Sequence, residues 1–429
     1  MDAIIINPQR SEWPELTGRP QINSADLQQV VSEIINNVRQ FGDKAVKEYS
    51  LKFHGFMPEN LWVTEEEISS AKKQVDKDLK KAILLAKKNI EKFHKAQISK
   101  IKKIETSSGV VCWRKSVPVE NVGLYIPGGS APLFSTLLML AIPAKIAGCK
   151  NIIVTTPADR SGKVDAAILF VADILGLKNI YKGGGAQAIA ALAYGTQTVE
   201  KVDKIFGPGN QYVTYAKKLV SIDGVAIDML AGPSELAVYA DDTCVPAFVA
   251  ADLLSQAEHG ADSQVVLVAA DKQIIEKIIE EIHKQLPSLE RKEIVEKSFL
   301  NRRFIVMEEP KEAFDFLNEY APEHLIIASE KAEELSSKIK NAGSVFLGNY
   351  SPESAGDYAS GTNHSLPTNG TAKTFSGVSV DSFVKKITFQ KLSKKGIENI
   401  GPAVEKMAAA EKLDAHKNAI SVRLKKNKK

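Results

Sequence analysis

Apolar residues recur at helical spacing in the first quarter of the chain. Between residues 23 and 100, apolar positions lie three and four residues apart among many Lys and Glu side chains. This spacing predicts helices over 25–41 and 64–98, with a break in the second near Lys77. The prolines of the first 22 residues favour an extended N-terminal arm.

From Val122 onward, short apolar runs alternate with helical patterns and tight glycine turns. Repeated strand–helix units are typical of parallel sheets covered by helices on both faces. We therefore expect an α/β fold of two tandem doubly wound, incomplete Rossmann-like domains, with a helical N-terminal region and a small C-terminal helical extension. Strands are predicted in two series, 122–126, 152–155, 180–182, 204–206 and 225–230, then 236–239, 265–268, 304–307, 325–327 and 345–347.

Several separate segments are expected to build the two domains. The N-terminal arm covers 1–22 and the C-terminal helical extension covers 382–429. The second α/β domain carries most of the glycine-rich loops. The remaining segments are divided into 23–121, about 236–320 and 365–381 for the first α/β domain, and 122–235 and about 321–364 for the second.

Composition is that of an ordinary globular protein. The 429 residues are 44% hydrophobic and 25% charged, with a net charge of +4. Nucleic-acid binding has little support, because no basic patch is interleaved with aromatic residues. The longest apolar region, 131–148, is interrupted by two prolines and a lysine, so no membrane span is expected. A short N-terminal apolar run and three unpatterned cysteines favour a cytoplasmic location: Cys112, Cys149 and Cys244.

Two glycine-rich loops each connect a predicted strand to a predicted helix. They are Gly183-Gly184-Gly185-Ala186-Gln187 and Gly207-Pro208-Gly209-Asn210. Backbone amides at such a helix start can face the phosphates of a nucleotide. Neither loop has the G-x-G-x-x-G spacing, and a tight turn required by the fold explains each loop equally well. With a third loop at Gly128-Gly129, the set favours a nucleotide or phosphate ligand.

Four polar residues at predicted helix ends and loops could bind a metal. Gln256 and His259 are three residues apart at the end of an apolar helix, so their side chains share one face. Asp357 lies in a polar loop and His416 on a C-terminal helix. Each alone is better explained by a structural or solvated position than by a ligand role, but together they form a nitrogen and oxygen set suited to zinc. Three other histidines lie in charged helical contexts and are expected at the surface: His54, His94 and His283.

An acidic residue and a histidine, Glu323 and His324, stand side by side before a predicted strand. One could activate water while the other moves substrate protons. Neighbouring strand residues point to opposite faces, so the pair can act together only where the backbone is irregular, which Pro322 permits. A long, polar, glycine-rich loop over 356–364, ending at His364, also favours a functional role.

These motifs together resemble the histidinol dehydrogenase family, zinc enzymes that oxidise L-histidinol to L-histidine with NAD. The resemblance covers nearly the whole chain, from Asn23 to Leu424. Its motifs occur in the order VGLYIPGG at 122–129, GGAQA at 184–188, GPGN at 207–210, AGPSE at 231–235, LSQAEH at 254–259, APEHL at 321–325 and LDAH at 413–416.

The resemblance implies which residues form the site. It implies one zinc ion per subunit, in a homodimer with a shared active site, and the ligands Gln256, His259, Asp357 and, as fourth, His416 of the partner subunit. Glu323 and His324 match the catalytic pair. Substrate contacts are implied for the zinc ligands and for Ser234, His324, His364 and Glu411. The NAD-contacting positions are in the second α/β domain, at Tyr125, Gln187 and Asn210.

The implied reaction is a four-electron oxidation of L-histidinol through bound L-histidinal, the last step of histidine biosynthesis. In that reaction His324 acts as general base, Glu323 activates water and zinc orients the substrate. Two local departures from the family pattern leave every functional side chain in place. Lys412 stands where a glycine is expected, and Leu236-Ala237 is a small variation after the AGPSE motif.

Three other readings of the sequence remain open. A thiol aldehyde dehydrogenase would use Cys149 or Cys244 as nucleophile, although no histidine lies near either in sequence. A dehydrogenase for a related amino alcohol or aldehyde would share the same side chains. A catalytically inert zinc-binding protein is disfavoured, because Glu323 and His324 are both present.

Overall fold

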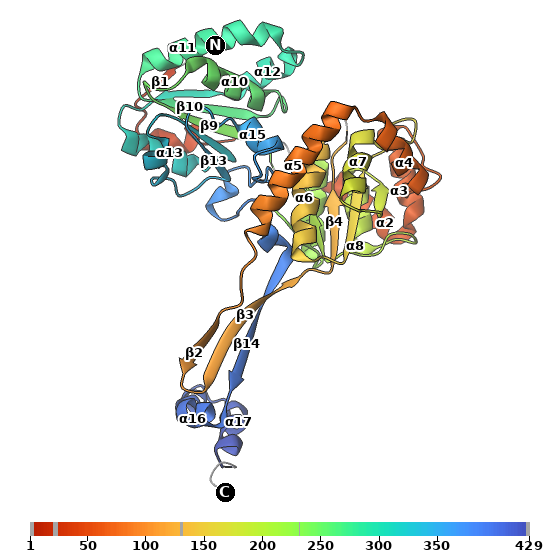
Figure 1. Cartoon of the computed structure of the whole chain (residues 1–429), viewed down its shortest axis with the longest axis vertical. Coiled ribbons are helices and arrows are strands. Elements are labelled where there is room, and N and C mark those ends of the chain that lie inside the picture. The colour runs from red at the N-terminus through yellow and green to blue at the C-terminus, as the bar shows by residue number, and fades with distance from the viewer. Residues whose placement is uncertain (1–3, 20–24, 129–131, 231, 426–429) are drawn as a thin grey trace.

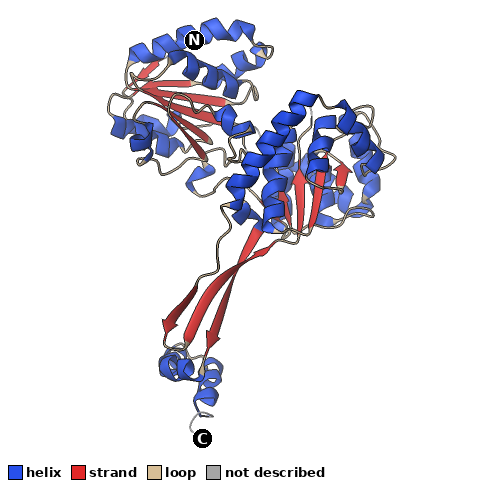
Figure 2. Cartoon of the chain, in the orientation of Figure 1, coloured by secondary structure: helices blue, strands red, loops and turns tan. Residues whose placement is uncertain are grey.

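A computed structural model describes residues 4–19, 25–128, 132–230 and 232–425. The chain forms two α/β lobes and a long stalk that extends away from them (Figure 1). Helices surround the sheet of each lobe, whereas the stalk consists of strands that end in two helices at its tip (Figure 2). Within the described residues, no helix is both long and apolar enough to cross a membrane.

One lobe, which we call the five-stranded lobe, is built on a parallel sheet with strand order β6-β5-β4-β7-β8. Successive residues of β4 face opposite sides of this sheet, as the strand period requires. Val122 and Leu124 pack into one hydrophobic cluster and Tyr125 into another. The strands are β4 (Asn121–Tyr125), β5 (Asn151–Thr156), β6 (Ile180–Lys182), β7 (Lys204–Phe206) and β8 (Ala226–Ile227).

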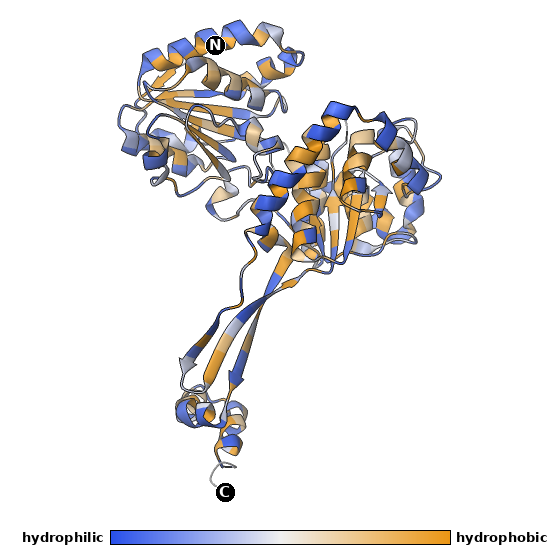
Figure 3. Cartoon of the chain, in the orientation of Figure 1, coloured by the Kyte–Doolittle hydropathy of each residue, from blue (hydrophilic) through white to orange (hydrophobic). Residues whose placement is uncertain are grey.

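Helices from two parts of the chain cover the five-stranded sheet. Residues of α4 to α7 pack on one face, and residues of α2, α3, α8 and α9 pack on the other. Every residue of α6 from 135 to 144 is buried, which fits the apolar colour of this helix in Figure 3. The helices are α2 (Ala25–Phe41), α3 (Asp43–His54), α4 (Glu65–Gln74), α5 (Lys77–Lys95), α6 (Phe134–Ala147), α7 (Ala166–Ile174), α8 (Gly185–Tyr194) and α9 (Gln211–Ile222).

The six-stranded lobe contains a parallel sheet with strand order β1-β11-β10-β9-β12-β13. Residues of α10, α11 and α12 pack on one face, and residues of α1, α13 and α14 pack on the other. The elements are β1 (Ile4–Ile6), α1 (Trp13–Leu16), β9 (Glu235–Ala240), α10 (Pro246–Ala257), β10 (Gln264–Ala269), α11 (Lys272–Gln285), α12 (Lys292–Ser298), β11 (Arg303–Val306), α13 (Pro310–Tyr320), β12 (His324–Ala328), α14 (Ala332–Ser336), β13 (Ser344–Leu347) and α15 (Glu353–Tyr358).

Both sheets share one winding pattern. If β1 is set aside, the strands of each lobe run 3-2-1-4-5 in their order along the chain. The direction of winding therefore reverses between β4 and β7 in one lobe and between β9 and β12 in the other. Ligands of doubly wound sheets bind where the winding reverses, so these two positions are the places to look for a site.

The stalk is a three-stranded antiparallel sheet with order β14-β3-β2, and most of its residues are exposed or half-buried. Nine residue pairs join β3 and β14 without a register shift. Helices α16 and α17 pack on each other at the tip, far from both lobes (Figure 1). The elements are β2 (Lys103–Ser107), β3 (Val110–Pro118), β14 (Val384–Leu392), α16 (Lys394–Ala410) and α17 (Asp414–Lys425).

The expected fold class is confirmed, but the structure groups the segments differently. The strands of 321–364 belong to the six-stranded lobe, because β12 pairs with β9. The helices of 25–95 pack on the five-stranded sheet instead of the sheet expected for segment 23–121. The N-terminal arm is not simply extended, since β1 pairs with β11 of the same chain. The C-terminal extension contains a long strand, β14, as well as helices.

Candidate active site

A cavity of about 590 Å³ lies between the two lobes. The five-stranded lobe lines it with residues that follow the carboxyl ends of β4 and β7, including Pro127 and the loop 207–210. The six-stranded lobe lines it with Ser234 and Glu323, which precede the amino ends of β9 and β12. The winding reversals of both sheets therefore face one cavity, although only one of them presents the carboxyl edge at which ligands of such sheets usually bind.

Glu323 and His324 lie together at the buried start of β12. The backbone N–H of Glu235 donates a hydrogen bond of 3.0 Å to Glu323 Oε2. His324 Nδ1 lies 3.7 Å from the same oxygen, and His324 Nε2 lies 3.5 Å from Asp357 Oδ1. The pair can meet because the backbone is irregular here, with Ala321 in the left-handed region at φ 51°.

Burial controls the proton affinity of this pair. It raises the pKa of Glu323 to about 8, and the nearby carboxylates of Glu235 and Asp357 act in the same direction. Burial alone would lower the pKa of His324, but the surrounding carboxylates, chiefly Glu323, outweigh it and raise the pKa to about 10. The charge of His324 only partly offsets the effect of burial on Glu323, whereas the charge of Glu323 is the chief cause that raises the pKa of His324.

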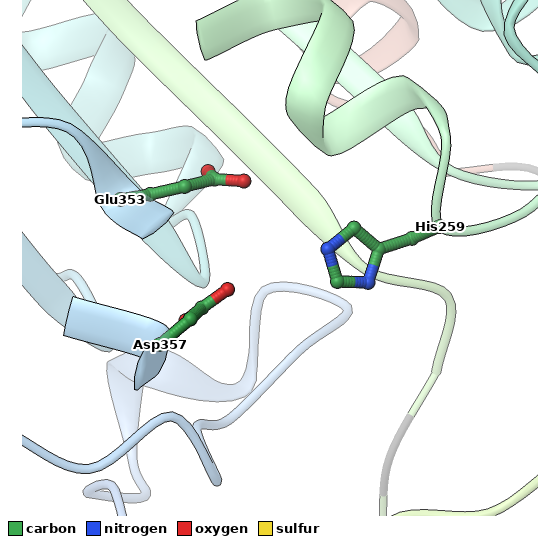
Figure 4. Close-up of side chains that lie close together, drawn as sticks. All are labelled: His259, Glu353 and Asp357. Carbon is green, nitrogen blue, oxygen red and sulfur yellow. The ribbon is translucent and has the colours of Figure 1, made fainter. Parts of the chain in front are cut away.

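Three side chains beside this pair could hold a metal ion. One ligand atom from each of His259, Glu353 and Asp357 lies within 4.8 Å of the others, and the three converge from the end of α10 and from α15 (Figure 4). Gln256 is fully buried nearby on α10, and both polar atoms of its amide meet no hydrogen-bond partner among the described residues. Unsatisfied buried polar atoms are costly, so they indicate a ligand.

Glu353 was missed by the sequence analysis. It is fully buried, both of its carboxylate oxygens lack a hydrogen-bond partner among the described residues, and burial raises its pKa to about 8. The available signal was its position four residues before Asp357, which places both carboxylates on one face of a helix.

His364 connects the two lobes at the cavity. Its Nδ1 lies 2.9 Å from the backbone oxygen of Asp357, and its Nε2 lies 3.1 Å from Thr136 Oγ1 on α6. Both ring nitrogens are therefore engaged within the chain. His364 lines the cavity, and its ring connects Asp357 of one lobe to Thr136 of the other.

Two of the expected site residues lie far from the cavity. His416 is on α17 and Glu411 directly follows α16, so both are at the tip of the stalk, away from the lobes (Figure 1). His259, by contrast, is exposed at the metal group, which leaves one side of that group open in the single chain. The structure thus brings together Gln256, His259 and Asp357 but not His416.

Three residues were expected to contact NAD, and two of them line the cavity. Tyr125 accepts a hydrogen bond of 3.1 Å from the backbone N–H of Gly185. Asn210 caps α9, because its Oδ1 accepts bonds from the backbone of the first turn, which leaves its amide group to face a ligand. Gln187 is fully buried in the first turn of α8, and its amide meets no partner among the described residues.

A buried ion pair shapes the loop between β7 and α9. Lys217 Nζ donates to the backbone oxygen of Gly207 at 2.8 Å and pairs with Asp228, whose other oxygen accepts from the backbone N–H of Gly207 at 2.8 Å. Gly207 has φ 124°, and a Cβ there would lie 2.0 Å from the backbone oxygen of Tyr125. Only glycine fits this close approach of the loop to β4.

The two cysteines considered as nucleophiles are not in the candidate site. Neither is among the described residues that line the cavity. Burial raises the pKa of Cys149 and of Cys244 to about 11, which disfavours the reactive thiolate. The thiol reading of the sequence therefore loses its support. Gly129 and Ala231, which belong to two of the motifs, lie outside the described residues.

The geometry agrees with comparisons to known proteins. The family model described as histidinol dehydrogenase matches residues 17–424. The chain belongs to the histidinol dehydrogenase family. A histidinol dehydrogenase from Bacteroides fragilis is 57% identical over 99% of this chain and 100% of the relative. Another from Campylobacter jejuni is 53% identical over 97% of both. The crystal structure of histidinol dehydrogenase from Elizabethkingia anophelis superposes with a TM-score of 0.98 at 56% identity, covering 99% of this chain and 98% of that one.

Proposed function

We propose that this chain oxidises L-histidinol to L-histidine with NAD, through bound L-histidinal, as the last step of histidine biosynthesis. The observation that carries the proposal is the buried Glu323–His324 pair, which adjoins the candidate metal group of His259, Glu353 and Asp357, with His324 Nε2 3.5 Å from Asp357 Oδ1. Glu323 and His259 both line the cavity. Membership of the histidinol dehydrogenase family supports the substrate and the cofactor.

The residues present fit a zinc ion. Gln256, His259 and Asp357 offer nitrogen and oxygen ligands, and the unpartnered amide of Gln256 is explained by such a role. The fourth ligand would be His416 of the partner subunit, for which the exposed side of His259 leaves access. Zinc, when bound, would orient the imidazole and the amine of the substrate.

Glu323 and His324 divide the proton transfers between them. In the first oxidation the neutral form of His324 accepts the proton of the substrate hydroxyl. Because the neighbouring carboxylates raise the pKa of His324 to about 10, the imidazolium must first release its own proton. In the second, Glu323 removes a proton from the water that adds to the aldehyde. Both side chains are buried, which limits the access of bulk water and competing proton donors to them.

The cofactor would lie at the winding reversal of the five-stranded lobe. Tyr125 and Asn210 line the 590 Å³ cavity there, and Gln187 underlies the neighbouring glycine loop. A second cavity of about 860 Å³ beyond the end of β5 shares Gly128 with the first, which gives room for an extended dinucleotide. NAD, when bound, would accept the hydride in each of the two oxidations.

The position of the stalk supports a homodimer with shared sites. The tip carries Glu411 and His416, which cannot reach the cavity of their own chain, and it exposes the apolar side chains Met407, Leu413 and Val422. Helix α10, the segment before α15 and the end of α15 also expose apolar side chains: Phe248, Tyr350 and Tyr358. We propose that the stalk of each subunit places its tip against this surface of the other.

NADH formation on L-histidinol tests this function. We expect about two NADH per substrate, loss of activity when metal is stripped, and recovery when zinc is restored. One NADH per substrate with release of free aldehyde would contradict the two-step reaction. Turnover of a related amino alcohol but not L-histidinol would keep the reaction type and change the substrate.

A further inference from the structure

Arg19, near the end of the N-terminal segment, is largely shielded from solvent. Its side chain is only 11% exposed and forms a two-point ion pair with Glu235, with distances of 2.8 and 3.1 Å. The same guanidinium donates to the backbone oxygen of Tyr320 at 2.5 Å. It also lies over the Tyr320 ring, 3.7 Å from the ring centre.

Glu235 connects Arg19 to the catalytic pair. It is the first residue of β9 and directly follows Ser234, which lines the cavity. The backbone N–H of Glu235 donates to Glu323 Oε2, so the carboxylate expected to activate water is held by the residue that Arg19 holds. The side chain of Glu235 is itself buried, and without Arg19 its charge would be uncompensated beside Glu323.

Tyr320 provides the second connection. It is the last residue of α13, three residues before Glu323, and its hydroxyl donates to Gln264 Oε1 at 2.8 Å. The next residue, Ala321, has the left-handed conformation that turns the chain from α13 toward β12. Arg19 therefore holds the backbone at Tyr320, where this turn begins. Through Glu235 it also holds the carboxylate of Glu323, where the turn ends.

We infer that Arg19 is a positioning residue for Glu323, acting from outside the cavity through Glu235 and the Tyr320 carbonyl. This inference rests on the proposed function. It assigns the N-terminal segment, whose strand β1 and helix α1 belong to the six-stranded lobe, a part in the second oxidation. A lysine cannot replace the two-point contact to Glu235 and the carbonyl bond together.

The test compares Arg19→Met and Arg19→Lys with the wild type, starting once from L-histidinol and once from L-histidinal. We expect Arg19→Met to lower kcat for the aldehyde by roughly ten- to a hundredfold with little change in KM, because a misplaced catalytic group loses rate more than binding. Arg19→Lys should fall between the two. Arg10→Met is the matched control, since Arg10 is in the same segment and pairs with Asp315 but is 66% exposed.

A double substitution separates positioning from general damage. In the Glu323→Gln background, Arg19→Met should have no further effect on the aldehyde step, because the group it positions is gone. An additive loss would overturn the inference. If Arg19→Met fails to fold, Arg19→Met with Glu235→Gln removes both charges of the buried pair and should fold, with an aldehyde step at least roughly tenfold slower than wild type. A double variant with the wild-type rate would overturn the role.

The same experiment distinguishes this inference from the function on which it rests. A wild type that oxidises neither substrate would overturn the proposed function and the role of Arg19 with it. A wild type that oxidises both, beside an Arg19→Met variant of equal kcat, would overturn the role of Arg19 alone.

Discussion

His324 Nε2 lies 3.5 Å from Asp357 Oδ1, so the expected general base touches an expected zinc ligand directly. The other nitrogen of the same ring faces Glu323 at 3.7 Å. His324 thus joins the group that would activate water to the group that would hold the metal. A substitution of Glu323 or Asp357 changes the electrostatic environment of His324. The two oxidations are therefore coupled through one imidazole.

Replacing Glu323 with Gln should slow the second oxidation more than the first. We expect a loss of roughly 10²- to 10³-fold when the reaction starts from L-histidinal, because general-base assistance is removed while the shape is kept. Stopped-flow measurement of each hydride transfer would show the difference. The exposed Glu330→Gln is a control in the same lobe. Equal slowing of both steps would contradict the assigned role.

The pH dependence of the aldehyde step should report the same carboxylate. Glu323 accepts a proton only when it is ionised, and burial raises its pKa to about 8. The rate should therefore rise as pH increases through about 8, instead of reaching its plateau near pH 5 as an exposed glutamate would allow. Glu323→Gln should remove this dependence. A wild-type rate that is flat from pH 6 to 9 would refute the assignment.

Two inactive variants should restore activity to each other if the site is shared between subunits. His259→Asn and His416→Asn damage residues of one proposed metal site that lie far apart in one chain. After mixed unfolding and refolding, half of the dimers are hybrids with one intact site, so about a quarter of the wild-type activity should return. Each variant refolded alone is the control. No recovery in the mixture would mean that His416 does not complete the site of a partner.

Both candidate cysteines should be dispensable. Cys149→Ala with Cys244→Ala should retain kcat within about twofold, since neither thiol lines the cavity and burial raises the pKa of both to about 11. Their alkylation should be slow at pH 8 and accelerate as pH rises toward 11, because the thiolate is the reactive form. Loss of the aldehyde step in the double variant would instead support a mechanism in which one of these thiols attacks the aldehyde.

The sequence predicted those parts of the fold whose hydrophobic pattern is strong. The strand–helix alternation that begins near residue 122 reports burial on both faces of a parallel sheet, so both sheets were expected close to their observed bounds. The stalk was missed because its strands are largely exposed and carry many lysines, as in Val384–Leu392, which gives no core-facing pattern. The lobe to which each segment belongs depends on strand pairing far apart in sequence, as between β9 and β12.

The sequence also predicted part of the candidate site. Pro322 indicated the irregular backbone that lets Glu323 and His324 meet. His94 was expected at the surface, yet it is fully buried, with its Nε2 3.3 Å from Asn363 in the loop that carries His364. That contact spans 269 residues, and a helical pattern rich in lysine gives no sign of it. Glu353 was hidden for the same reason, since its burial comes from tertiary packing.

Lys412 occupies the position where the sequence analysis expected a glycine, and the backbone there has the left-handed conformation that favours glycine. Lys412, between α16 and α17, has φ 60°, a left-handed conformation that costs a residue with a side chain about 1 kcal/mol or more. Lys412→Gly should therefore raise the free energy of unfolding of the helix pair by about 0.5–1 kcal/mol, after the larger chain entropy of glycine is deducted.

Lys412→Ala is the matched control for this strain. It removes the same exposed side chain but keeps the Cβ, so it should leave the stability unchanged. Limited proteolysis of the stalk tip would follow both variants, because cleavage there reports local opening of α16 and α17. Equal protection of the glycine and alanine variants would show that the conformation at 412 is not strained. Since Glu411 is adjacent, a rise in stability with an unchanged kcat would also show that the family's glycine serves the turn and not the chemistry.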